Sequence, residues 1–293
     1  MNRQSPYATA LLLFSALAAP LAAQDMPLSD VLIDGEGWEQ VAEGYRFTEG
    51  PAVDSQGNLF FVDVPADLVL KHEVASGETT TFASEVGGTS GLMFGPDGKL
   101  YGSQLPSGRI VRFSNSGEVE VIAEAIGGND LAIAENGDIY TTDPSNQQVW
   151  LIRPNGEKEV VASGFGYANG VILWGDGGSL VVADTKDHSL WTFRVEADGT
   201  LSAGAKDFAL MLPLGVTEGR ADGMTVDTKG RLYVASAYGL QMFDSTARIS
   251  GVISNPHTRP MSNVVFAGPD RQTLYITCGD KLFRRKTAAN GVR

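Results

Sequence analysis

The sequence is poor in the residues that build disulfides and zinc sites. It has one cysteine, Cys278, and three histidines among 293 residues. A single thiol cannot form an intramolecular disulfide, and the scattered His72, His188 and His257 fall short of a zinc site. Cys278 ends a β-rich run, so we expect a small buried hydrophobic residue there. We expect the histidines to lie at the surface or in turns.

Basic residues are also scarce. The chain has 22 Lys+Arg against 35 Asp+Glu, which gives a formal net charge of −13. A surface that binds nucleic acid is normally basic, so this composition argues against a nucleic-acid partner. It suits a soluble exported protein or one that holds a cation. With 43% hydrophobic and 19% charged residues, the chain is apolar enough for a sizeable core.

Long apolar runs are limited to the N-terminus. Arg3 precedes an apolar run over residues 8–17, and small residues then lead to Ala22 and Ala23. This order is typical of a secretory signal peptide, and the alternative is an N-terminal membrane anchor. We predict a signal peptide over residues 1–23, a single domain over 24–293 and a periplasmic or secreted location. No stable membrane association is expected after cleavage.

Glycine is abundant, with 35 residues, or roughly 12% against the usual ~7%. Many of these glycines belong to one recurring phrase: a polar residue, a small residue, an apolar stretch, a turn and an apolar strand. The copies are Glu49–Asp63, Ser90–Gln104, Asn129–Asp143, Asn169–Asp184, Asp222–Ser236 and Asn263–Thr277. They start 41, 39, 40, 53 and 41 residues apart, and four of these intervals have the length of a four-stranded propeller blade.

The residue patterns within each copy also indicate a four-stranded blade. Short β-rich runs follow Gly, Asp or Asn turns, as in β-hairpins, and helical spacing of apolar residues is not sustained. The sequence therefore predicts an all-β fold, a six-bladed β-propeller. The segment Val31–Arg46 should supply an outer strand that closes the ring against the last blade. The longest interval should hold an extra loop within Ala203–Arg220.

The first residue of each copy carries a side-chain oxygen. These six residues are Glu49, Ser90, Asn129, Asn169, Asp222 and Asn263. Equivalent positions on the innermost strands of a propeller surround its central channel, so we predict a ring of oxygen ligands there. Glu49, Asn169 and Asp222 suit a hard cation such as Ca²⁺ or Mg²⁺, and Asn129 either joins them or binds substrate. The alternative is that these residues only form turns or caps. It does not explain well why a polar residue precedes an apolar strand at the same position in all six copies.

Several phrases of the sequence resemble the regucalcin/gluconolactonase family of six-bladed propellers. They are Thr48-Glu49-Gly50-Pro51, Asn129-Asp130-Leu131, Asn169-Gly170 with Val182-Ala183-Asp184-Thr185, Ala221-Asp222-Gly223-Met224 and Asn263-Val264-Val265-Phe266. Their order and spacing extend over nearly all of residues 24–293. The resemblance implies a lactone hydrolase with a divalent cation in its channel, commonly Ca²⁺, with Mg²⁺, Zn²⁺ or Mn²⁺ as alternatives.

The same resemblance implies roles for individual residues. Glu49, Asn169 and Asp222 match the metal ligands, and Asp222 also matches the proposed general base. Asn129 matches a catalytic residue that contacts the metal or the substrate. The remaining ring members, Ser90 and Asn263, are assigned to substrate binding.

One position departs from the family pattern. Sugar-lactone members often carry an arginine two residues before the asparagine at position 129, where it grips substrate hydroxyls. Here that residue is Gly127. We therefore predict that the substrate pocket is roomier and less polar beside Gly127, and that the small-molecule substrate is a lactone other than a sugar lactone.

Two other functions stay open from the sequence. Propellers host many proteins that are not enzymes, so an exported module that binds calcium or another ligand in its channel is one of them. An organophosphate or aryl esterase on the same scaffold is the other. Asp222 favours hydrolysis, because a site that only binds calcium needs this carboxylate less than a hydrolase does.

Overall fold

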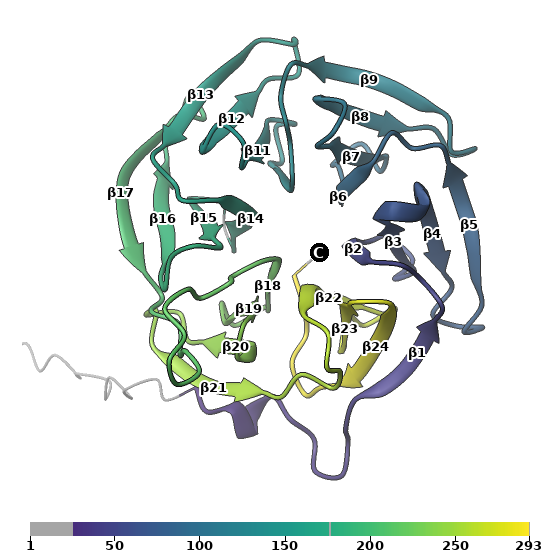
Figure 1. Ribbon diagram of the computed structural model, residues 1–293, viewed down its shortest axis with the longest axis vertical. Coiled ribbons are helices and arrows are strands. Elements are labelled where there is room, and N and C mark those ends of the chain that lie inside the picture. The colour runs from purple at the N-terminus through teal and green to yellow at the C-terminus, as the bar shows by residue number, and fades with distance from the viewer. Residues whose placement is uncertain (1–25, 176, 293) are drawn as a thin grey trace, which may run out of the picture.

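Six four-stranded antiparallel sheets stand around a central axis (Figure 1). The computed structural model describes residues 26–175 and 177–292, so the predicted signal peptide of residues 1–23 lies outside the described residues. Within these ranges the helical elements are two short 3-10 turns, η1 (Leu28–Asp30) and η2 (Val64–Ala66). No helix of the described part is long and apolar enough to cross a membrane. The predicted six-bladed β-propeller is confirmed.

The first three blades follow the chain order, with the first strand of each blade nearest the axis and the fourth at the rim (Figure 1). Their strands are β2 (Thr48–Val53), β3 (Leu59–Asp63), β4 (Leu68–His72) and β5 (Thr79–Ser84) in blade 1; β6 (Thr89–Phe94), β7 (Leu100–Gln104), β8 (Arg109–Phe113) and β9 (Val119–Glu124) in blade 2; and β10 (Leu131–Ile133), β11 (Ile139–Asp143), β12 (Gln148–Ile152) and β13 (Lys158–Ser163) in blade 3.

The other three blades continue this order, except that blade 6 takes its rim strand from the N-terminal part of the chain. Their strands are β14 (Ala168–Trp174), β15 (Ser179–Asp184), β16 (Leu190–Val195) and β17 (Leu201–Asp207) in blade 4; β18 (Met224–Val226), β19 (Leu232–Ser236), β20 (Gly239–Phe243) and β21 (Ile249–Ile253) in blade 5; and β22 (Met261–Ala267), β23 (Thr273–Cys278), β24 (Lys281–Lys286) and β1 (Glu39–Glu43) in blade 6.

The pairing of β1 with β24 closes the propeller. The two strands are antiparallel, with Glu39 opposite Arg284 and Glu43 opposite Lys281. This confirms the closing strand predicted within residues 31–46. The start of the predicted extra loop was wrong, because β17 pairs with β16 as far as Asp207. The loop therefore covers residues 208–223.

A turn used in several blades explains part of the glycine content. Between β2 and β3, Gly57 has a φ of 87°, and its N–H donates to the Asp54 carbonyl at 3.1 Å. The Asp54 carboxylate accepts the N–H groups of Gln56 and Asn58 at 2.9 and 2.8 Å. Positive φ favours glycine, and an aspartate can bond to the backbone two residues ahead. Aspartate followed by glycine three residues later therefore forms this tight turn.

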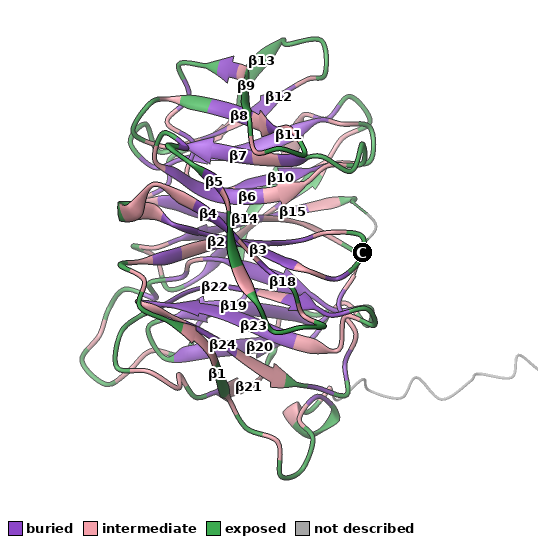
Figure 2. Cartoon of the chain, turned by 90° about the vertical axis from the view of Figure 1, so that its right-hand side faces the viewer, coloured by how far each residue is buried: buried purple, intermediate pink, exposed green. Residues whose placement is uncertain are grey.

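The apolar core lies between neighbouring blades. At the seam between blades 1 and 6, for example, Phe61 and Leu70 pack with Tyr275 and Leu282. Figure 2 shows buried residues along the strands and exposed residues mostly in the loops. Such packing fixes each blade against the next, and so holds the inner strands in one register around the axis.

The two ends of the central axis differ. The predicted ring residues lie at the end where the inner strands begin, which we call the ring end. At the opposite end the C-terminal segment turns inward: Gly291 forms a β-bridge with Asp227, and the N–H of Val292 donates to the Val226 carbonyl at 3.3 Å. Figure 1 places the C-terminus near the axis. This tail lies at the opposite end of the axis from the ring.

Two predictions about single residues have different outcomes. Cys278 is buried, as expected. His72 is not a surface or turn residue: it lies on β4 and has no exposed surface. Its Nδ1 is 2.9 Å from the Thr79 hydroxyl on the paired strand β5. The prediction was wrong because the alternating pattern of β4 turns this side chain into the seam with blade 6.

Candidate active site

The six predicted ring residues all lie where the inner strands begin. Glu49, Ser90 and Asn169 are the second residues of their strands, Asn263 is the third, and Asn129 and Asp222 come just before β10 and β18. Contacts join neighbours in the ring. The Ser90 hydroxyl donates to the Asn129 carbonyl at 2.8 Å, and the Asn263 amide donates to a Glu49 carboxylate oxygen at 3.4 Å.

Glycines beside the ring residues let the inner strands converge. A Cβ at Gly50 would lie 2.2 Å from the Ser90 carbonyl oxygen, and a Cβ at Gly170 would lie 2.2 Å from the Asp222 carbonyl oxygen. Neither distance is sterically possible. The small residue that follows the polar residue in the repeated phrase is therefore required by the close approach of neighbouring blades.

Glu49 and Asp222 form the acidic part of the ring. Burial, and then the charge of Asp130, raise the pKa of Glu49 to about 8, although the N–H of Gly50, which donates to Glu49 at 2.7 Å, lowers it. Burial, then the charges of Glu49 and Asp130, raise the pKa of Asp222 well above its ordinary value. These groups therefore lie close enough together to repel one another when ionised.

Asp130 is a third acid that the sequence reasoning gave no role. Burial raises its pKa to about 6, although the N–H of Leu131 donates to its carboxylate at 2.9 Å. A signal was present in the sequence: Asp130 occupies the position that holds Gly50, Gly91 and Gly170 in other copies. A carboxylate in place of a glycine, at the point where strands converge, is expected to have a function.

Asn169 is held in a fixed orientation from blade 4. Its amide nitrogen donates to the Thr185 hydroxyl at 2.9 Å, and that hydroxyl donates to the Ala221 carbonyl at 2.9 Å. Asn169 also hydrogen-bonds with the Asp222 carboxyl group, which opposes the rise of the Asp222 pKa. The chain Ala221–Thr185–Asn169 thus links the ring positions of blades 4 and 5.

The acids that end the second strands support the ring from behind. Asp184 accepts the N–H groups of Gly166 and Tyr167 at 2.6 and 2.8 Å, and Asp63 accepts those of Arg46 and Phe47 at 3.0 and 3.2 Å. These bonds hold the loops that lead into β14 and β2. Both aspartates therefore serve strand-end hydrogen bonding.

Tyr167 is a further residue that the sequence reasoning missed. It is half-buried, two residues before Asn169. Burial raises the pKa of its hydroxyl, and the charges of Asp222 and Glu49 raise it further. The phenol is therefore within electrostatic reach of the ring acids. An aromatic residue in a loop gives no such signal in the sequence.

The donor chemistry of the ring fits a hard divalent cation. The charge of Asp130 raises the pKa of Glu49, and the charges of Glu49 and Asp130 raise that of Asp222. None of these three carboxyl groups forms an ion pair with a basic side chain of the described residues. The ring offers carboxylate and amide oxygens, together with the hydroxyl of Ser90, and Ca²⁺ and Mg²⁺ prefer oxygen ligands. No three Asp, Glu, His or Cys side chains of the described part gather as one metal cluster. A bound cation would therefore need an amide oxygen, such as that of Asn169.

Two of the positions assigned to substrate, Ser90 and Asn263, have hydrogen bonds within the ring. Asn263 contacts Glu49, as described above, while Ser90 turns its hydroxyl to the Asn129 carbonyl. Gly127 is half-buried; a Cβ there would lie 3.3 Å from an Asp143 carboxylate oxygen and 3.7 Å from a Leu105 methyl carbon. A side chain at 127 would begin between one acidic and one apolar neighbour.

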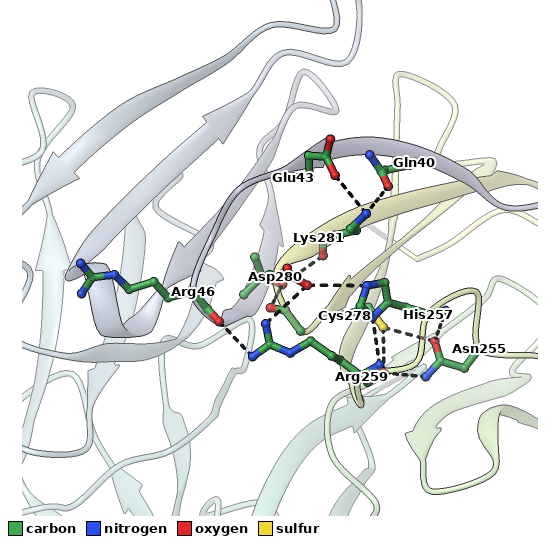
Figure 3. Close-up of polar contacts among 11 residues, drawn as sticks. Gln40, Glu43, Arg46, Asn255, His257, Arg259, Cys278, Asp280 and Lys281 are labelled. Carbon is green, nitrogen blue, oxygen red and sulfur yellow. Dashed lines mark hydrogen bonds and ion pairs between the residues drawn. The ribbon is translucent and has the colours of Figure 1, made fainter.

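A second polar cluster lies at the ring end of blade 6 (Figure 3). Cys278, His257 and Asp280 are all present, but they do not form a nucleophilic triad. The Cys278 thiol contacts the Asn255 side-chain oxygen at 3.2 Å, and burial raises its pKa to about 11. His257 accepts the Arg259 N–H through Nδ1 at 2.9 Å, while Nε2 faces Asp280 at 3.6 Å. No base activates the thiol, so this cluster is structural.

Comparisons with known proteins agree with this architecture. Residues 47–280 match the family model described as SMP-30/gluconolactonase/LRE-like region. Pentonolactonase XacC of Haloferax volcanii is 23% identical over 247 residues, which cover 79% of this chain and 81% of that protein. Lactonase drp35 of Staphylococcus epidermidis is 26% identical over 257 residues, which cover 81% of this chain and 75% of that protein.

The structure of a gluconolactonase from Xanthomonas campestris has the same fold, with a TM-score of 0.78 at 24% identity over 89% of this chain and 92% of that one. The chain therefore belongs to the SMP-30/gluconolactonase/LRE-like family.

Proposed function

We propose that this protein is a divalent-cation-dependent hydrolase that opens the ring of a lactone. Family membership and the lactonase relatives support the reaction class. The observation that carries the proposal is the group of three acids, Glu49, Asp130 and Asp222, whose charges no basic side chain of the described residues neutralises. Such a group is costly to bury unless a cation compensates it.

Glu49, Asn169 and Asp222 would hold the cation, and Ca²⁺ is the first candidate. When bound, the cation supplies Lewis-acid polarisation of the lactone carbonyl. Asn169 is already oriented for this role, because its amide nitrogen is bonded to Thr185 and leaves the oxygen for other partners. Asp130 lies close enough to Glu49 to add negative charge beside the ligands.

The chain's own residues would complete the reaction. Asp222 would accept a proton from the attacking water, and Asn129 would orient the substrate through its amide group. Tyr167, near Asp222 and Glu49, would donate its hydroxyl to an oxygen of the bound lactone. Together these groups would position the water and the carbonyl carbon for attack.

The substrate is proposed to be a lactone with an apolar substituent. At the edge where sugar-lactone members often carry an arginine, this chain has Gly127, with Leu105 close by. Fixed donors for sugar hydroxyls are therefore fewer on this side. Ser90 and Asn263 are the other ring positions that we assign to substrate.

A substrate screen with and without chelator tests the proposal. Alkyl-substituted lactones, aldonolactones, aryl esters and phosphotriesters would be assayed with the full protein, in EDTA and after Ca²⁺ is restored. We expect hydrolysis of alkyl-substituted lactones that EDTA abolishes and Ca²⁺ restores. Faster turnover of phosphotriesters or aryl esters would assign the alternative esterase, and cation binding without any turnover would assign a binding module.

We also propose that the protein is exported. The support is the pattern of residues 1–23 in the sequence. N-terminal sequencing of the protein recovered from the periplasm or the medium should give Gln24 as the first residue. Recovery only in the cytosol with the N-terminus intact would refute export without affecting the proposed reaction.

A further inference from the structure

Asp130 of blade 3 and Asn263 of blade 6 meet across the axis, although their blades lie on opposite sides of the propeller (Figure 1). The Asn263 side chain hydrogen-bonds with the Asp130 carboxyl group, which opposes the rise that burial gives to the Asp130 pKa. Asp130 also accepts the N–H of Leu131 at 2.9 Å and the N–H of Val171 in blade 4. A side chain that reaches two other blades in this way lies at the axis itself.

Glycines of the blades beside them leave the space for this contact. A Cβ at Gly91 of blade 2 would lie 2.8 Å from an Asp130 carboxylate oxygen, and a Cβ at Gly223 of blade 5 would lie 1.8 Å from Cγ of Asn263. Both distances are too short for real atoms. Blades 2 and 5 therefore carry glycine where the side chains of Asp130 and Asn263 occupy the space that a Cβ would need.

The Asn263 amide is engaged at both ends. Its Oδ1 accepts the N–H of Val264 at 2.9 Å, and its Nδ2 donates to a Glu49 carboxylate oxygen at 3.4 Å. An amide nitrogen carries two hydrogens, so the same group can donate to Glu49 and to Asp130 together. These two acids otherwise repel each other, since after burial the charge of Asp130 raises the pKa of Glu49. The amide thus places neutral donors between two acids that come from different blades.

We propose that Asp130 and Asn263 are positioning residues, which form a brace across the axis and fix the Glu49 carboxylate for cation binding. This inference rests on the proposed function, because Glu49 is one of the proposed ligands. Groups that hydrogen-bond to a ligand side chain orient it, and their removal typically lowers metal affinity about 10- to 100-fold. Direct contact of Asn263 with the substrate is the alternative, and the two roles predict different kinetics.

Asn263→Ala and Asn263→Leu both remove the donors without changing the net charge, and leucine also fills the space of the amide. We expect the affinity for Ca²⁺, measured by calorimetry in each variant that circular dichroism shows to be folded, to fall at least about tenfold. Turnover of an alkyl-substituted lactone should recover at saturating Ca²⁺, with KM for the lactone unchanged. Asn155→Ala is the matched control, because Asn155 lies in an exposed turn between β12 and β13. It should bind Ca²⁺ as the wild type does.

Asp130→Asn tests the other half of the brace. In that background, Asn263→Ala should lower the Ca²⁺ affinity by at most about threefold more, because residues that act as a unit have effects that do not add. A folded Asn263 variant that binds Ca²⁺ as tightly as the wild type would overturn the proposal. A raised KM that saturating Ca²⁺ does not correct would overturn it too, in favour of substrate contact. Absence of Ca²⁺ binding by the wild type itself would instead refute the cation-dependent function on which the brace depends.

Discussion

At the scale of single residues, the ring combines acids that repel one another with amides that are held in place. Glu49 is bonded by the Gly50 N–H and the Asn263 amide, and Asn169 is bonded to Thr185. These neutral donors orient the ring groups without cancelling the negative charge. The position of each side chain is therefore set by the fold, while no basic side chain of the described residues neutralises the charge of the acids.

Glu49→Gln tests the charge of one proposed ligand while size and hydrogen-bonding capacity are kept. We expect the affinity for Ca²⁺ to fall at least about tenfold, roughly 1.4 kcal/mol, because one ligand charge is lost. The propeller should remain folded, since the β2–β3 pairing does not depend on this carboxylate. Calorimetric titration with Ca²⁺ measures the effect, and circular dichroism checks the fold. Unchanged Ca²⁺ affinity would show that Glu49 is not a ligand.

Gly127→Arg tests whether this position selects the substrate. Gly127 does not adopt positive φ, so a side chain is compatible with its backbone. An arginine would offer fixed donors to sugar hydroxyls, worth about 1–3 kcal/mol when charge-assisted. We expect kcat/KM for an aldonolactone, relative to an alkyl-substituted lactone, to rise at least about tenfold, or roughly 1.4 kcal/mol.

A matched variant separates the effect of added hydrogen-bond donors at position 127 from the effect of a larger side chain there. Gly127→Leu narrows the same edge without adding donors, so it should lower turnover of the alkyl-substituted lactone without improving the aldonolactone. If the two variants change the ratio equally, bulk alone explains the effect. Efficient hydrolysis of gluconolactone by the wild type would show that another residue does the work of the missing arginine.

At the scale of elements, much of the fold could be predicted because each blade is specified locally. Tight turns such as Asp54–Asn58 and alternating strands recur at one interval, so the number and kind of blades follow from the sequence. The ring could be predicted for the same reason, since its members share one register. The orientation of a side chain could not, because it depends on the neighbouring blade. Asp130 and the buried His72 were missed for that reason.

Convergence of the inner strands predicts the effect of Gly170→Ala. The added methyl group would lie 2.2 Å from the Asp222 carbonyl oxygen, so blades 4 and 5 must separate. We expect a loss of at least about 1–3 kcal/mol in the free energy of unfolding, together with weaker cation binding. Gly37→Ala is the matched control, because nothing lies within 4 Å of its added Cβ and its φ is not positive. Equal stability of both variants in urea denaturation would contradict this account.

The seam that closes the propeller should be sensitive to acid. Burial, and then the nearby Arg284, lower the pKa of His72 below its ordinary value. The unfolded chain therefore binds a proton more readily than the folded one, so stability is full above about pH 6.5 and falls as the pH drops below it. One such group contributes at most about 1.4 kcal/mol per pH unit.

His72→Asn removes this titration while a hydrogen-bonding group can still meet Thr79. We expect the slope of unfolding free energy against pH, between about pH 6.5 and 5, to become shallower than in the wild type. Urea denaturation at several pH values measures that slope. A slope that does not change would show that other groups cause the acid sensitivity.

At the scale of the whole molecule, the net charge of −13 means that any salt should stabilise the protein by screening. A specific cation site predicts something different. Ca²⁺ at 100 times its dissociation constant should add about 2.7 kcal/mol to the free energy of unfolding, and raise the melting temperature by roughly 5–10 °C. EDTA should reverse this gain in stability, and sodium chloride at equal ionic strength should reproduce only a small part of the gain.

The variant Glu49→Gln separates a specific site from screening. Because it keeps almost all of the net charge, it should lose most of the stabilisation by calcium and keep the stabilisation by sodium chloride. If calcium and sodium stabilise equally at equal ionic strength, screening explains the gain and the ring holds no cation.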